Sequence, residues 1–141
     1  MTNIKDLQRF LDAQEKNYLD ALSEIKNGKK QSHWMWYIFP QIQGLALSET
    51  SKFYAIKNIQ EAKEFLDHPV LGKRLIEISK ALLNLETNDA HKIFGSPDEM
   101  KLHSSMTLFS SLSGPNTVFQ KVLDKYCDGK KDEKTLELIE Q

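Results

Sequence analysis

Residues 68–85 read HPVLGKRLIEISKALLNL, and their apolar side chains are spaced for one face of a helix. The spacing alternates between four and three residues along Leu71, Leu75, Ile78, Leu82 and Leu85. This period is typical of an amphipathic helix whose apolar stripe packs on a core. Pro69 favours the first helical position, because its φ angle suits the helix and its missing N–H needs no partner there. The stretch therefore predicts a core helix that begins at Pro69.

Similar patterns on both sides of this stretch predict helices almost from end to end. A long first helix is indicated between Asn3, a good N-cap, and Gly28, a natural helix stop. Further helices are predicted over 58–66, 88–94, 96–112, 118–126 and 132–139. No alternating run is long enough for a strand, and residues 29–56 are the least regular. We expect an all-α fold, a compact single-domain helical bundle of about six to eight helices over residues 1–141.

The helix over 96–112 has the clearest start signal in the chain. Ser96 is suited to the N-cap, Pro97 to the first helical position, and Glu99 completes a capping box. A similar box is predicted at Asn58 and Glu61, and Asp132 is expected to cap the last helix.

Composition excludes several classes of protein. With 19 basic and 20 acidic residues the net charge of the 141-residue chain is −1, so we expect no nucleic-acid binding. One cysteine excludes a disulfide framework, and 40% apolar residues argue against disorder. The N-terminal residues have no apolar segment typical of a signal peptide, and no apolar run approaches membrane-spanning length. We expect a cytoplasmic protein with no membrane partner.

Aromatic residues concentrate in SHWMWYIFPQ, residues 32–41, which holds four of the 13 aromatic side chains and both tryptophans. If Ser32 caps a short helix here, apolar side chains point in several directions, and Phe39 must leave the helix because it precedes proline. Two interpretations remain open. The rings fill the core, with tryptophan N–H groups on backbone carbonyls, or they line a ligand pocket together with His33 and Gln41.

The helix that follows Ser96 is unusually rich in serine and threonine. Its apolar stripe is Leu102, Met106, Phe109 and Leu112, with Ser105 at the edge. Small side chains there predict either close packing of a neighbouring helix or, together with Lys101, a pocket wall for an anionic ligand. His103 is expected to face solvent.

The remaining residues do not show the spacing that a metal site or a phosphate-binding loop requires. Four scattered histidines and one cysteine form no metal signature, and the glycines form no phosphate-binding loop. Lys26, Lys29 and Lys30 are interpreted as a solvated turn rather than a phosphate site. We expect no metal and no cofactor.

Several short motifs together resemble the bacterial family known as domain of unknown function 1810. They are HWMWYIFPQ (33–41), YAI (54–56), HPVLG (68–72) with Arg74-Leu75, IFGSPD (93–98), Lys101-Leu102 and SSMTLF (104–109). The resemblance implies a compact all-helical domain and brings no activity or cofactor. Some members of the family carry the label calpastatin, which nothing in these residues supports. Polar positions that recur in the family match His33, Gln41, Tyr54, His68, Arg74, Asp98, Lys101 and Ser105.

Two functions fit these observations. In the first, the chain binds or hydrolyses a small anionic ligand, a nucleotide or ADP-ribose-like compound, with His33 or Asp98 as general acid or base. The ligand-binding residues would be Trp34, Trp36, Tyr37, Gln41, Tyr54, Arg74, Lys101 and Ser105. In the alternative, the chain is a non-catalytic protein-interaction or regulatory module, either a monomer or a weak homodimer. The residues leave open whether the chain is an enzyme.

Overall fold

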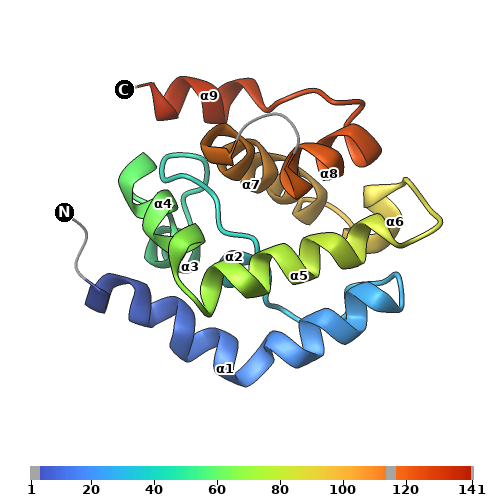
Figure 1. The fold of residues 1–141 in the computed structure, drawn as a ribbon, viewed down its shortest axis with the longest axis horizontal. Helices are drawn as coiled ribbons and strands as arrows, with labels where there is room; N and C mark the ends of the chain where they lie inside the picture. The colour runs from blue at the N-terminus through green and yellow to red at the C-terminus, as the bar shows by residue number, and fades with distance from the viewer. Residues whose placement is uncertain (1–3, 114–116, 141) are drawn as a thin grey trace.

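The computed structural model describes residues 4–113 and 117–140, and within them the chain forms nine α-helices (Figure 1). They are α1 (Ile4–Lys26), α2 (Met35–Ile38), α3 (Glu49–Tyr54), α4 (Ile59–Asp67), α5 (Leu71–Leu83), α6 (Ala90–Phe94), α7 (Asp98–Ser113), α8 (Val118–Tyr126) and α9 (Glu133–Ile139). The all-α prediction is confirmed. The count exceeds the predicted six to eight because the sequence pattern misses α3, a short helix whose N-cap Ser48 accepts a hydrogen bond from the backbone of Ser51.

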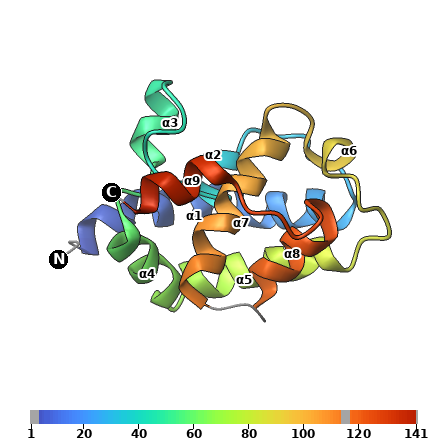
Figure 2. The same cartoon turned by 90° about the horizontal axis from the view of Figure 1, so that it is seen from above.

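The helices surround one hydrophobic core in three rough layers. Helix α1 runs along one side and packs against α5, which in turn packs against α8 and α4 (Figure 1). Helix α7 lies near the centre, where it contacts α4, α6, α8 and α9. Viewed from above, α9 crosses over α7, and α3 projects at the edge of the molecule (Figure 2). None of the helices described here is long and apolar enough to cross a membrane.

The central position of α7 explains its serine-rich sequence. Side chains from Ser104 to Ser110 are all buried, so the helix has no solvent-facing side along this stretch. Small hydroxyl residues allow neighbouring helices to approach, and they bond to their own helix: the Thr107 hydroxyl donates to the His103 carbonyl at 2.8 Å. The close-packing interpretation therefore accounts for most of these residues.

Asp132 caps α9, as predicted, and also docks it onto α7. Its Oδ2 accepts hydrogen bonds from the backbone N–H of Thr135 and from the hydroxyl of Ser104, both at 3.1 Å. The backbone N–H of Asp132 donates to the Thr107 hydroxyl oxygen at 2.9 Å. One short loop thus satisfies the start of α9 and two buried hydroxyls of α7.

The predicted start of α5 at Pro69 is wrong by two residues. The helix begins at Leu71, and its N-cap position, Val70, makes no side-chain hydrogen bond. In the turn before it, His68 Nδ1 accepts hydrogen bonds from the backbone N–H groups of Val70 and Leu71. Gly72, in the first turn, faces the preceding helix so closely that a β-carbon there would lie 1.9 Å from the Leu66 carbonyl oxygen. The turn between α4 and α5 therefore needs a glycine at this position.

The predicted start of α7 also shifts, by one residue. Pro97 lies before the helix, and the Ser96 hydroxyl donates to the Glu99 carboxylate at 2.6 Å instead of accepting from the backbone. His103 is half-buried rather than solvated, with its Nε2 2.8 Å from the Lys130 carbonyl oxygen. At Asn58 the predicted cap is confirmed, since its side chain accepts from the backbone of Glu61 at 2.9 Å.

The irregular stretch before α4 is held by backbone pairing. Ile42 and Ile56 form a single parallel bridge: the Gln43 N–H donates to the Ile56 carbonyl, and the Ile56 N–H donates to the Gln41 carbonyl, each at 2.9 Å. This bridge closes the loop that contains α3 and brings the ends of the loop side by side.

Candidate functional site

The aromatic segment lies mostly in the core. Trp34, Met35, Tyr37, Ile38 and Phe39 are buried, and among the aromatic residues of α2 and its flanks only the Trp36 side chain is partly exposed. Ser32 does not cap the helix, because α2 begins at Met35 and its N-cap position, Trp34, makes no side-chain hydrogen bond. The core interpretation therefore fits Trp34 and Tyr37, whose rings have no face open to a ligand in this structure.

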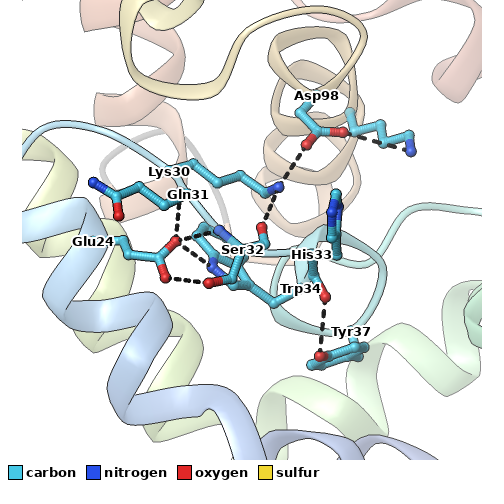
Figure 3. A network of polar contacts seen from close by, with 9 residues as sticks. Glu24, Lys30, Gln31, Ser32, His33, Trp34, Tyr37 and Asp98 are labelled. Atoms are coloured by element: carbon cyan, nitrogen blue, oxygen red, sulfur yellow. Dashed lines mark hydrogen bonds and ion pairs between the residues drawn. The ribbon is translucent and has the colours of Figure 1, made fainter.

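Glu24, near the end of α1, anchors this segment (Figure 3). Its carboxylate accepts hydrogen bonds from the Trp34 indole N–H at 2.9 Å, from the Gln31 backbone at 2.6 Å, and from the backbone and hydroxyl of Ser32 at 2.9 and 2.7 Å. The indole N–H thus donates to a carboxylate and not to a backbone carbonyl, the partner that the core interpretation assumed. Burial alone would raise the pKa of Glu24, but the four donated bonds outweigh it and lower the pKa to about 2.

Three charged side chains form a second network beside the segment (Figure 3). Asp98 Oδ2 lies 3.0 Å from the Lys30 ammonium, and Asp98 Oδ1 lies 3.6 Å from the Lys101 ammonium. Lys30 also donates to the Ser32 carbonyl and stands 5.1 Å from the centre of the Trp34 ring. The interpretation of Lys30 as part of a solvated turn is wrong, since only 9% of its side chain is exposed.

Lys101 reaches from α7 into a small niche beside Trp36. The Lys101 ammonium lies 5.4 Å from the centre of the Trp36 ring, a cation–π distance. The niche has a volume of about 10 Å³, room for about one water molecule. Its walls are Met35, Trp36, Phe39, Gln41, Ser51, Tyr54, Ala55 and Lys101. Four of the predicted ligand-binding residues meet there, from three segments of the chain: Trp36 and Gln41 from the aromatic segment, Tyr54 from α3 and Lys101 from α7.

A groove of about 800 Å³ adjoins the niche and shares Gln41, Ser51 and Ala55 with it. The loop before α3, α3 itself, the start of α4 and the end of α9 form its walls. The other lining residues are Ile42, Gln43, Gly44, Ala46, Leu47, Lys52, Lys57, Asn58, Ile59, Gln60, Leu138 and Ile139. Among the described residues that line groove and niche, the charged side chains are Lys52, Lys57 and Lys101, with no carboxylate.

Other predicted residues lie away from this site. Arg74 packs on the Tyr18 ring, 5.1 Å from its centre, and reaches Gln14, so it serves the α1–α5 contact. The Tyr37 hydroxyl donates to Asn17 at 2.7 Å. His33 is exposed at the surface of the loop before α2.

Ser105 lies on α7, one turn beyond Lys101, and does not line the niche. Its side chain is fully buried, and its hydroxyl has no hydrogen-bond partner among the residues that the structure describes.

Sequence reasoning missed Glu24, Lys30 and the groove. Glu24 sits in a helix of mixed charge, and nothing in its local pattern distinguishes it from the solvated carboxylates nearby. The groove forms only where the Ile42–Ile56 bridge and the end of α9 meet. Across residues 4–113 and 117–140, no three histidine, cysteine or carboxylate side chains gather in a way that could hold a metal ion.

Comparison with protein families matches residues 4–139 to the family described as "Protein of unknown function (DUF1810)". The chain belongs to this family. A similar solved structure is the conserved hypothetical protein Rv1873 from Mycobacterium tuberculosis, 39% identical over 96% of this chain and 97% of that one, with a TM-score of 0.93. Comparison with curated proteins found no match. Neither description states an activity.

Proposed function

We propose that this chain binds a small anionic ligand of the nucleotide or ADP-ribose-like class. The ligand lies in the groove and directs one anionic oxygen into the niche toward Lys101. The observation that carries the proposal is the meeting of Trp36, Gln41, Tyr54 and Lys101 around a niche that shares Gln41, Ser51 and Ala55 with the groove.

Size and charge support this choice of ligand. A groove of about 800 Å³ lies within the range of roughly 300–1,000 Å³ typical of small-molecule sites. The niche takes one oxygen and not a ring, because it holds about one water. Lysine side chains and neutral amides, with no carboxylate among the residues that line the groove or the niche, favour an anion. Apolar walls from Ile42, Ile59 and Leu138 suit a planar group.

The proposal concerns binding rather than hydrolysis. Both oxygens of Asp98 are in ion pairs with lysines, which is the arrangement of a structural carboxylate. A catalytic role for His33 and Asp98 stays a prediction.

Isothermal titration calorimetry with ADP-ribose and ADP tests the proposal, with adenosine as the uncharged comparison. We expect adenosine to bind at least about tenfold more weakly, which is about 1.4 kcal/mol. Lys101→Met and Trp36→Leu should each weaken ADP-ribose binding by a similar factor. Lys29→Met, an exposed lysine outside both linings, is the matched control and should bind as the wild type does. If none of these ligands binds, or if Lys101→Met binds them unchanged, the proposal is wrong.

A protein-interaction module is the second candidate, favoured by two exposed apolar side chains. Leu47 is 82% exposed and Phe53 is 59% exposed, and both belong to the segment that projects with α3 (Figure 2). Side chains of this kind on a projecting segment suit contact with a second copy of the chain. Sedimentation velocity of the wild type and of Leu47→Ser tests it: a concentration-dependent dimer that the variant loses supports this function, and a monomer at all concentrations refutes it.

A further inference from the structure

The network of Lys30, Asp98 and Lys101 has one carboxylate between two ammonium groups. Lys30 reaches Asp98 from the loop after α1 (Figure 3). Lys101 lies on α7, as Asp98 does, three residues further along the helix. All three side chains are largely shielded, with 9%, 18% and 20% of their surfaces exposed. At this depth charges interact more strongly than they do at an open surface.

The two ion pairs are unequal. The distance of 3.0 Å between Lys30 and Asp98 is that of a charge-assisted hydrogen bond, while 3.6 Å between Lys101 and Asp98 exceeds the usual range. Lys30 is further held by the Ser32 carbonyl and by the face of Trp34. Asp98 is therefore bound mainly by Lys30, and Lys101 remains directed toward Trp36 and the niche.

The net charge of these three side chains affects how strongly the niche attracts an anion. Two ammonium groups and one carboxylate carry a net charge of +1. Without Lys30 the group would be neutral, and Asp98 would compete with the anion for Lys101. Without Asp98 the group would carry +2.

We propose that Lys30 is a positioning residue that sets the anion affinity of the niche by binding Asp98 and so leaving Lys101 for the ligand. Asp98 then acts as an internal competitor that Lys30 restrains. This inference rests on the proposed function, since it assumes that Lys101 contacts the anion.

Titration calorimetry with ADP-ribose on four variants tests the inference. Lys30→Met should bind about tenfold more weakly, because the group becomes neutral, whereas Lys30→Arg should retain binding. Asp98→Asn should bind at least about threefold more tightly, because the charge rises to +2. The double variant Lys30→Met with Asp98→Asn should return to within about threefold of the wild type, because Lys101 again has no competitor. Urea denaturation of each variant checks folding, with Lys29→Met as the control.

The outcomes separate the inference from the proposed function. If Lys101→Met binds ADP-ribose as the wild type does, the proposed function fails and the inference fails with it. If Lys101→Met weakens binding but Lys30→Met does not, the inference alone is overturned. If Lys30→Met weakens binding and the double variant does not restore it, Lys30 acts only through the fold, and the inference is again overturned. Asp98→Asn tests the inference even if Lys30→Met does not fold. Weaker ADP-ribose binding by Asp98→Asn than by the wild type contradicts the inference.

Discussion

Replacing Glu24 with glutamine tests whether one ionised carboxylate holds the aromatic segment in place. The carboxylate accepts four hydrogen bonds, one of them from the fully buried Trp34. Glutamine is nearly the same size, but its NH₂ group faces donors and accepts none of their hydrogen bonds. We therefore expect Glu24→Gln to fold with lower stability at neutral pH.

The size of the loss follows from the pKa of Glu24. Against the opposing effect of burial, the donated hydrogen bonds lower this pKa from 4.5 to about 2. A difference of one pKa unit corresponds to about 1.36 kcal/mol, which gives about 3.4 kcal/mol as an upper limit. Glu24 is partly exposed, and solvent screening reduces this figure to about 2 kcal/mol. Because the folded pKa lies below the unfolded one, the stabilisation is complete above pH 4.5 and is lost as pH falls toward 2.

Urea denaturation followed by tryptophan fluorescence at pH 7 and pH 3 measures the effect. The free energy of unfolding of the wild type should exceed that of Glu24→Gln by about 2 kcal/mol at pH 7, and this difference should fall by more than half at pH 3. Glu15→Gln, an exposed carboxylate on the same helix, is the control and should show no such difference. A difference that is the same at both pH values would refute the electrostatic account, and no difference at pH 7 would refute the anchoring role.

Two further predictions concern packing. Gly72→Ala should lower the free energy of unfolding by about 3 kcal/mol or more, because its β-carbon would lie 1.9 Å from the Leu66 carbonyl oxygen. Gly28 has a left-handed φ of +79° and open space around it, so Gly28→Ala should lower the free energy of unfolding by only about 1 kcal/mol. If urea denaturation gave the same loss for Gly28→Ala and Gly72→Ala, the proposed contact between residue 72 and Leu66 would be contradicted. Ser105→Ala should leave thermal stability unchanged or raise it by up to about 1 kcal/mol, because the buried hydroxyl has no partner among the described residues. A loss above about 1 kcal/mol would show that this hydroxyl is hydrogen-bonded.

The helical fold is largely readable from the sequence, because its signals are local. The apolar stripe of 71–85 and the caps at Asn58 and Asp132 involve residues three or four positions apart, which a helix brings together by its own geometry. The two helix starts that were predicted wrongly, at Pro69 and after Ser96, lie beside local hydrogen bonds other than the expected ones. His68 accepts from the backbone N–H of Leu71, and the Ser96 hydroxyl donates to Glu99.

The candidate site is only partly readable, because its parts meet through tertiary packing. The composition of residues 32–41 indicates a special segment, but it does not distinguish Trp34, which packs inward onto Glu24, from Trp36, which lines the niche. Lys101 contacts Trp36 although the two residues are 65 positions apart in the sequence, and no local pattern indicates that contact. The sequence by itself determined which segments are helical and where the rings gather. The packing of α7 against the other helices decided which ring lies in the core and which lines the niche, because burial depends on neighbours that are distant in the chain.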